Sequence, residues 1–453
     1  MSHSSITYDA IIIGGGLSGL SAAVELTARG KKILLLEQRP FLGGRTYSFV
    51  DETTGDTVDN GQHLLMGCYH ETRRYLKRIG SEHLATLQPN LHIDFLHPER
   101  GKASLACPAL PSPLHVLTGL LRLQSLSFND RLKLLRVGME LFLHSSAKEQ
   151  RLQHLTVDEW LTSLGQTSVN KKYLWDIIAI GTLNDDPKTV SALLFYRVLR
   201  AAFAGTREDS SLLIPRVGLS ELLVDPAVRF LKAHGAEIRT DCGVKEILTD
   251  GNGVQGVRCE DGSVVTAGTY ISAVPYYALQ PLLKDSSTPQ FQYMTKFESS
   301  PIVTIHLWLD RSVMEEDFVA LLDLRVQWIF NKSGMFAQSQ ANRRQYLSLV
   351  ISGAAEYVAM EKDQLVALAM EDVCRVLPCA ASATVVHSLV IKEKRATFSP
   401  TPDIERMRPS AESGMSNFLL AGDWTNTGYP ATIEGAVLSG RQAAKLVDVG
   451  QIM

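Results

Sequence analysis

The chain has 453 residues, of which 45% are apolar and 21% charged, a composition typical of a folded globular protein rather than a disordered or fibrous one. This length exceeds what one hydrophobic core usually supports, so two or three lobes are expected. A formal net charge of −3 provides no basic surface for nucleic acid, and nucleic-acid binders are therefore excluded.

The six cysteines are sparse and form no CxxC pair, which favours reduced thiols in a cytoplasmic protein over a disulfide scaffold or a metal site. No cleavable leader is expected at the N-terminus, and the apolar run 10–20 is too short and too rich in glycine to span a membrane. Contact with a membrane surface stays open, because it needs only an exposed apolar patch.

The first elements form a βαβ unit. Residues 8–13, YDAIII, read as a strand buried on both faces of a parallel sheet. A helix is predicted from Leu17 to Gly30, and a second buried strand, KILLLE, ends at Glu37. A right-handed crossover places the two strands side by side.

A GxGxxG motif, formed by Gly14, Gly16 and Gly19, lies between this strand and this helix. The first glycine permits the tight turn, the second admits a pyrophosphate and the third lets helix and strand pack closely, while the helix start, with Leu17 and Ser18, attracts phosphate charge. The motif predicts a dinucleotide site.

Glu37 follows Gly19 by eighteen residues and ends the second strand, where a carboxylate accepts hydrogen bonds from ribose hydroxyls. We expect Glu37 and the adjacent Gln38 to contact the adenosine half of the cofactor.

The segment after Glu37 indicates which dinucleotide is bound. Phe41–Arg45, FLGGR, completes an ExxxxxGGR arrangement that resembles the flavin amine oxidase and phytoene desaturase superfamily. The resemblance implies FAD, with Gly43, Gly44 and Arg45 as a second contact to its phosphates, a task that suits the bidentate guanidinium. Some amine oxidases of this superfamily link FAD through a cysteine close to their C-terminal motif, and because no cysteine follows Cys379 here, we expect noncovalent FAD.

Later segments extend the resemblance along the chain. It implies that Gly61, Gln62 and His63 lie beside the flavin ring and that Val244 contacts adenine. It also implies cofactor contacts near the C-terminus, at Gly422, Asp423, Thr432, Ile433 and Ala436.

The resemblance and the element pattern together predict an α/β protein: a Rossmann-type, GR2-like FAD-binding domain of the amine oxidase and phytoene desaturase fold, with an α+β substrate lobe. A mainly helical stretch, a β-meander over 235–274 and a final strand and helix support this organisation. The predicted division assigns 1–70, 210–280 and 391–453 to the FAD domain, and 71–209 and 281–390 to the substrate lobe.

Three strings narrow the resemblance: DNGQHLLMGCY at 59–69, LNDDPKTVSA at 183–192 and GDWTNTGYPATIEGA at 422–436. They are similar to the squalene-associated FAD-dependent desaturase group, the hydroxysqualene dehydroxylases of squalene and hopanoid biosynthesis. The resemblance implies that reduced FAD delivers a hydride to the allylic cation left when hydroxysqualene loses its hydroxyl, with an unidentified reductant for FAD. A carotenoid-type desaturase, an amine oxidase and a noncatalytic flavin-binding protein are the alternatives.

Catalytic candidates follow from the same strings. His63 or Tyr69 could donate a proton to the leaving hydroxyl and Asn184 could orient it, although a lone histidine more often only hydrogen-bonds backbone or cofactor, and that is the favoured interpretation of His63. Tyr429 is a candidate tunnel wall or a core aromatic. The leucine-rich stretch 112–143 is either a membrane-docking surface or a helical core.

Overall fold

The computed structural model describes residues 8–250, 252–283, 289–336 and 344–447. A parallel five-stranded sheet organises the first lobe, in the order β10-β2-β1-β14-β20. Its strands are β10 (Glu237–Arg239), β2 (Ile33–Leu36), β1 (Tyr8–Ile13), β14 (Ala267–Ser272) and β20 (Phe418–Leu420).

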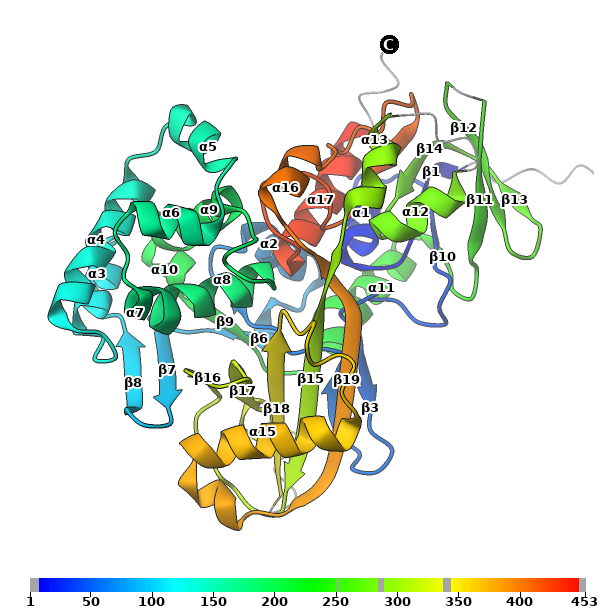
Figure 1. Ribbon diagram of the computed structural model, residues 1–453. Helices are drawn as coiled ribbons and strands as arrows, with labels where there is room; N and C mark the ends of the chain where they lie inside the picture. Colours follow the sequence, from blue (N-terminus) through cyan, green and yellow to red (C-terminus); the bar gives the residue numbers. More distant parts are fainter. Residues whose placement is uncertain (1–7, 251, 284–288, 337–343, 448–453) are drawn as a thin grey trace, which may run out of the picture.

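The central strand β1 is apolar and buried from Ala10 to Ile13 because both faces of the sheet are covered there. On one face Ile12 packs in a core shared with helices α1 (Leu17–Thr27) and α17 (Ile433–Leu446). On the other face Ile11 packs against the antiparallel β-meander formed by β11 (Val244–Thr249), β12 (Val254–Cys259) and β13 (Val264–Val265). The predicted βαβ unit is observed, and Figure 1 shows α1 and α17 together beside the sheet.

The prediction of one β-meander over 235–274 was partly wrong. Only the middle of that stretch forms the meander, whereas β10 and β14 at its ends join the parallel sheet. The turn signals in the sequence mark strand ends, but they do not distinguish an antiparallel neighbour from a parallel one.

A seven-stranded sheet forms the second lobe, in the order β19-β15-β18-β17-β16-β7-β8. Its strands are β19 (Val385–Phe398), β15 (Ser299–Leu309), β18 (Gln345–Ser352), β17 (Trp328–Asn331), β16 (Phe318–Leu321), β7 (His92–His97) and β8 (Gly101–Ala106). Helix α15 (Lys362–Val376) covers one face and buries the alternate residues of β15 that include Val303 and Ile305 (Figure 1). The other face of β15, with His306 and Trp308, lies toward the candidate site.

Helices make up most of residues 114–210, where they pack around a separate core. They are α3 (Leu114–Arg122), α4 (Phe128–Phe142), α5 (Ser146–Leu152), α6 (Val157–Ser163), α7 (Ser168–Asn170), α8 (Asp176–Leu183), α9 (Ala192–Phe203) and α10 (Arg207–Ser210).

The stretch 71–209 also holds strands that its pattern did not reveal, β6 (Ala85–Leu87), β7 and β8, two of which complete the second sheet. The predicted α/β class, with a parallel dinucleotide-type sheet and an α+β lobe, is confirmed. The five-segment division stays a prediction, and its last boundary, at 390/391, falls inside β19.

Shorter elements connect the lobes: β3 (Ser48–Val50), β4 (Thr57–Asp59), β5 (Leu65–Met66), α2 (His70–Ile79), β9 (Leu212–Pro215), α11 (Asp225–Ala233), α12 (Tyr276–Leu282), α14 (Lys332–Met335) and α16 (Pro402–Met407). In the described part of the chain, no helix combines the length and apolar character that crossing a bilayer requires.

Candidate cofactor and active site

The glycine turn after β1 leaves almost no room for side chains except at one point. Gly14 has φ +105°, and a Cβ on Gly19 would lie 1.9 Å from the Gly14 carbonyl oxygen. A Cβ on Gly16 would meet no atom within 4 Å. Gly16 also begins α1, whose N-terminus has no side-chain cap, so its positive end faces open space.

A second glycine pair lies against this turn. The Gly43 amide donates to the Gly15 carbonyl over 2.8 Å, and a Cβ on Gly44 would come within 3.1 Å of the Gly16 Cα. Both glycines adopt positive φ, +105° and +61°, which other residues rarely tolerate. The two turns predicted to contact phosphate are therefore adjacent.

Glu37 stabilises this arrangement from the end of β2. Its carboxylate accepts hydrogen bonds from the amides of Gly15 at 2.7 Å and Arg39 at 2.9 Å. Its carbonyl accepts the Cys242 amide at 2.9 Å, which brings the half-buried Val244 at the start of β11 to the same end of the sheet, whereas Gln38 is exposed.

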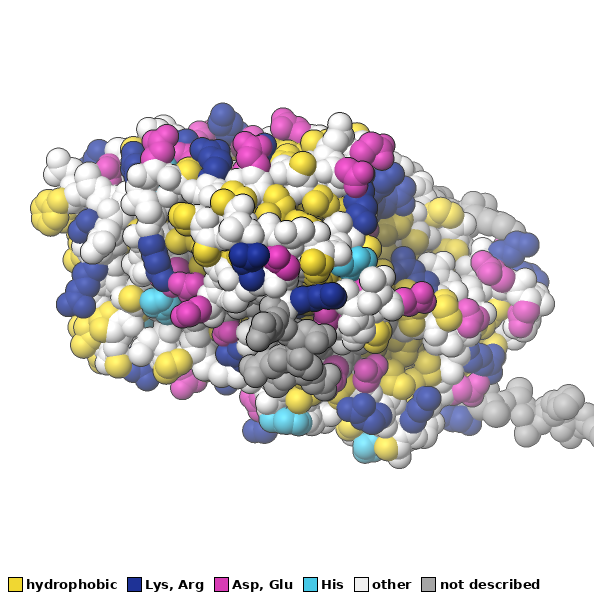
Figure 2. Space-filling model, turned by 90° about the horizontal axis from the view of Figure 1, so that it is seen from below, with side chains coloured by type: hydrophobic (Ala, Val, Ile, Leu, Met, Phe, Trp, Pro, Cys, Tyr) yellow, Lys and Arg dark blue, Asp and Glu magenta, His cyan; other side chains and the backbone are white. Residues whose placement is uncertain are grey.

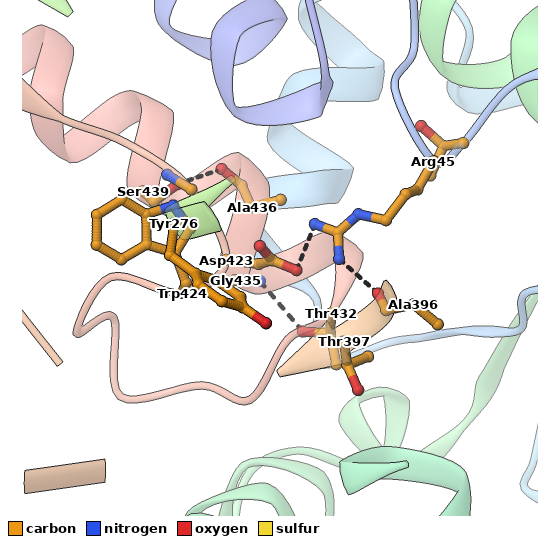
Figure 3. Close-up of polar contacts among 12 residues, drawn as sticks. Arg45, Tyr276, Ala396, Thr397, Asp423, Trp424, Thr432, Gly435, Ala436 and Ser439 are labelled. Carbon is orange, nitrogen blue, oxygen red and sulfur yellow. Dashed lines mark hydrogen bonds and ion pairs between the residues drawn. The ribbon is translucent and has the colours of Figure 1, made fainter. Parts of the chain in front are cut away.

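Arg45 and Asp423 form an ion pair at 2.7 Å, although 378 residues separate them (Figure 3). Arg45 also donates to the Ala396 carbonyl on β19. Gly422 has φ +147°, and its amide donates to the Ser439 hydroxyl of α17 at 2.9 Å. The GGR and GDW motifs thus meet at one point.

Thr432 caps α17, because its hydroxyl accepts the Gly435 amide at 3.2 Å. Ile433 is buried and Ala436 half-buried in the first turn of this helix, and Glu434 is almost fully buried. The Glu434 carboxylate accepts the amides of Glu71 and Thr72 at 3.0 and 2.9 Å, so α17 also fixes the start of α2.

Tyr69 immediately precedes α2, and its hydroxyl is bonded to the Thr432 side chain. Burial, reinforced by neighbours such as Cys68 and Glu434, raises the pKa of Tyr69 well above its ordinary value. Burial likewise raises the pKa of the Cys68 thiol to about 12. The tyrosine is a proton-bearing group throughout the physiological pH range.

The segment 59–63 is held by a buried ion pair. Asp59 Oδ2 accepts from Lys332 Nζ at 2.7 Å, while Oδ1 accepts the Ser48 hydroxyl and the Leu219 amide. Burial by itself would raise the pKa of Asp59, but Lys332 and these other donors lower it below its usual value. Sequence reasoning missed Lys332, since nothing around it in the sequence signals that a lysine is buried.

His63 folds back on its own turn, with Nδ1 2.9 Å from the Gly61 carbonyl oxygen. This contact requires the hydrogen on Nδ1, which leaves Nε2 as an acceptor in the neutral ring. Burial lowers the pKa of His63, so the neutral form prevails.

Asn184 ends α8 in a left-handed conformation, with φ 56°. Its amide donates to the Ser300 carbonyl and the Thr397 hydroxyl and accepts the Gly353 amide. These contacts join α8 to β15 and β19, and Thr397 is the neighbour of Ala396, whose carbonyl binds Arg45. The Asn184 side chain therefore holds these elements in position.

The comparisons with known proteins agree with this geometry. The family model described as flavin containing amine oxidoreductase matches residues 17–448. The chain belongs to the flavin-containing amine oxidoreductase family. It is a flavin-dependent oxidoreductase.

Among relatives of this flavin family, the chain is 29% identical to the hydroxysqualene dehydroxylase of Zymomonas mobilis, over 96% of this chain and 98% of that protein. It is 30% identical to the corresponding protein of Sinorhizobium fredii, over 96% and 97%. A 15-cis-phytoene desaturase of Synechococcus elongatus is 25% identical, over 96% and 95%. The resemblance indicated by the sequence motifs is confirmed.

A solved structure of putrescine oxidase has the same fold, with a TM-score of 0.72 and 16% identity over 98% of this chain and 99% of that one. The glycine turns fit a flavin dinucleotide. The open space at Gly16 faces the positive end of α1, and the Arg45 guanidinium lies beyond the second glycine pair. Among the described residues, no cluster of histidine, cysteine and carboxylate side chains suits a metal ion.

Proposed function

We propose that this flavoprotein binds FAD noncovalently and, with the flavin reduced, converts hydroxysqualene to squalene. The observation that carries the proposal is the likeness to hydroxysqualene dehydroxylases at 29–30% identity over nearly the whole of each chain, against 25–27% for phytoene and zeta-carotene desaturases. The pathway assigned by this proposal is squalene and hopanoid biosynthesis.

The proposed FAD site uses the two adjacent glycine turns. The amides at the start of α1, including those of Leu17 and Ser18, bind the pyrophosphate near Gly16, and Arg45 supplies a guanidinium. Glu37 retains acceptor capacity for the ribose beyond its bonds to the Gly15 and Arg39 amides.

Noncovalent attachment is supported by the cysteines. No cysteine follows Cys379 in the sequence, and the buried Cys68 thiol remains protonated because its pKa is about 12. A protonated thiol is a poor nucleophile for attack on a flavin.

Reduced flavin, when bound, supplies a hydride. The chain must then help the hydroxyl to depart as water, which requires a proton. Of the two candidates, Tyr69 carries a hydrogen on its hydroxyl throughout neutral pH, so we assign it to donating a hydrogen bond to the departing hydroxyl; its raised pKa makes it a weak acid, and the hydrogen bond rather than full proton transfer is its part. Neutral His63 offers Nε2 only as an acceptor, so we assign it to orienting the substrate hydroxyl.

Asn184 has a smaller part in this proposal. Both amide hydrogens and the amide oxygen bind protein groups, so it orients β15 and β19 rather than the leaving hydroxyl. An exchange of one of these partners for substrate would cost a buried hydrogen bond.

The test is anaerobic. The purified protein is reduced, hydroxysqualene is added, and flavin absorbance is followed while the extract is analysed for squalene. Reoxidation with one squalene per flavin supports the proposal. If instead a carotenoid precursor reduces the oxidised flavin and hydroxysqualene has no effect, the protein is a desaturase.

We also propose that the outer face of α3 and α4 contacts a membrane surface from which the isoprenoid substrate enters. Along α4, Phe128, Leu132, Leu135, Met139 and Phe142 form an exposed stripe spaced by three or four residues, and Phe128 and Met139 are 67% and 57% exposed. A separate row, with Leu134, Val137 and Leu141, faces the core. Residues 110–143 carry four basic and two acidic side chains, a balance suited to anionic lipid.

Figure 2 shows hydrophobic side chains with basic ones between them at the left end of the molecule, the end where α3 and α4 lie in Figure 1. The proposal predicts binding to anionic phospholipid vesicles that weakens about tenfold when Leu135 and Met139 are both changed to serine. Equal sedimentation of this variant and the unmodified protein with vesicles would contradict it. The matched control is Val264→Ser, at an exposed apolar residue on the distant β13.

A further inference from the structure

Lys332 is unusual among the lysines that the structure describes, because its side chain is completely buried. It begins α14, directly after β17, and its Nζ lies 3.7 Å from the centre of the Phe336 ring. Removing an ammonium group from water is costly, and an ion pair alone often fails to return that free energy. Lys332 therefore calls for an explanation other than stability.

Asp59, the partner of Lys332, lies 273 residues away, at the end of β4. The carboxylate is fixed on its other side by the Ser48 hydroxyl at 2.6 Å and the Leu219 amide at 2.8 Å. Asp59 is thus a rigid anchor that holds the ammonium group of Lys332 in one place.

Lys332 uses a second hydrogen bond, of 2.6 Å, to hold the Gln62 amide oxygen. The Gln62 amide nitrogen in turn donates to the His63 carbonyl at 3.2 Å, and the His63 ring binds the Gly61 carbonyl. The buried ammonium group is therefore linked to the His63 carbonyl through the Gln62 side chain, and the His63 ring in turn binds the Gly61 carbonyl.

Aromatic residues of the second-lobe sheet pack against Val58, the neighbour of Asp59. Tyr346 stacks on Trp308 with ring centres 4.3 Å apart and shares a 2.8 Å hydrogen bond with His306 Nδ1. The Tyr346 amide donates to the Ser333 hydroxyl, which fixes α14 and hence Lys332. The second-lobe sheet thus sets the position of a turn that belongs to the first part of the chain.

We propose that Lys332 is a positioning residue for the turn 61–63: it fixes the Gln62 carboxamide and, through the bond from that carboxamide to the His63 carbonyl, the backbone that carries the His63 imidazole. The inference rests on the proposed function, which places this turn beside flavin and substrate. Its expected consequence is that loss of the Gln62 contact changes the flavin environment even when the buried charge is balanced.

Two variants separate these effects. Lys332→Met removes the bond to Gln62 and leaves the Asp59 carboxylate buried without its cation. The double variant Asp59→Asn/Lys332→Met also removes that bond, but its uncharged carboxamide keeps an oxygen for the Ser48 hydroxyl and the Leu219 amide. The control is Asp372→Asn, which alters a buried carboxylate paired with Arg325 in the same lobe.

The measurements are thermal stability, the visible circular dichroism of the bound flavin, and the single-turnover rate of flavin reoxidation by hydroxysqualene. Both Lys332 variants should change the dichroism and slow reoxidation by roughly 10-fold to 100-fold, the scale of a small misplacement. The double variant should regain much of the stability that Lys332→Met loses. Asp372→Asn should lower stability alone.

A double variant with normal dichroism and rate would overturn the proposal, as would an equal loss of rate in Asp372→Asn. If Lys332→Met does not fold, the dichroism and reoxidation rate of the double variant are compared directly with those of the unmodified protein. If the unmodified protein does not turn over hydroxysqualene, the proposed function fails, and the dichroism still tests Lys332.

Discussion

The two ends of the candidate site are shaped by different parts of the chain: backbone at one end and buried side chains at the other. At the nucleotide end, backbone and glycines set the shape, and a Cβ on Gly19 would lie 1.9 Å from the Gly14 oxygen. At the turn 61–63, buried charged side chains such as Lys332 and Asp59 set the shape instead. Added atoms should therefore disable the first end, whereas the second should respond to altered charge.

Gly16→Ala should have the largest effect. The new methyl group meets no protein atom within 4 Å, so the cofactor-free protein should change its free energy of unfolding by less than about 1 kcal/mol. The same methyl group would stand where we place the pyrophosphate, so flavin affinity should fall on the order of 100-fold, by loss of close backbone approach. Equilibrium dialysis with FAD measures this change, and unaltered affinity would show that the pyrophosphate binds elsewhere.

The charged groups near the turn 61–63 should make the free energy of unfolding depend on pH. Burial lowers the pKa of His306 to about 3, with Lys332 acting in the same direction and Asp59 and Asp51 opposing. In the unfolded chain His306 takes up a proton near pH 6.5, whereas in the folded protein it stays neutral until the pH approaches 3. Stability is therefore lost as the pH falls below about 6.5.

Between pH 7 and pH 5 this histidine should cost about 2 kcal/mol of unfolding free energy. Urea unfolding at both pH values measures it, and His306→Asn should show a correspondingly smaller difference. An identical difference in the variant would mean that His306 does not titrate as the structure indicates.

Arg45→Lys should weaken flavin binding about tenfold, because an ammonium group cannot hold Asp423 and the Ala396 carbonyl while presenting a planar fork to phosphate. Flavin fluorescence during titration of the cofactor-free protein measures this effect. Unchanged binding would mean that Arg45 serves only to join the two motifs.

Gly138→Ala should give the smallest effect and the opposite sign. This glycine lies inside α4, and a Cβ there would meet nothing within 4 Å. Alanine should stabilise the fold by roughly 0.5–1 kcal/mol with no change in flavin content. Thermal unfolding measures the gain, and a loss of flavin would contradict the separation of glycines into structural and binding kinds.

The nucleotide end could be predicted from sequence because each of its parts is local. Strand β1 lies at the predicted residues 8–13, and the glycines follow it at fixed spacing. The contact between Arg45 and Asp423 was not derivable from spacing alone, since it depends on how β20 joins the sheet beside β14.

The second lobe was harder to predict because its sheet gathers strands from distant segments. Strand β7 pairs with β16, more than 200 residues later, and carries β8 at the sheet edge; nothing local in His92–His97 indicates that β16 is its partner. Lys332 was missed for the same reason: its burial is decided by Asp59, 273 residues away, and not by its neighbours in sequence.

The most direct test of the central claim uses isotope transfer. Protein with reduced flavin is equilibrated anaerobically in D2O, so that the exchangeable hydrogens of the flavin become deuterium, and hydroxysqualene is then added. The account predicts squalene that carries one deuterium, in an amount equal to the flavin oxidised. Squalene without deuterium, or no squalene while a carotenoid precursor is desaturated, would contradict it.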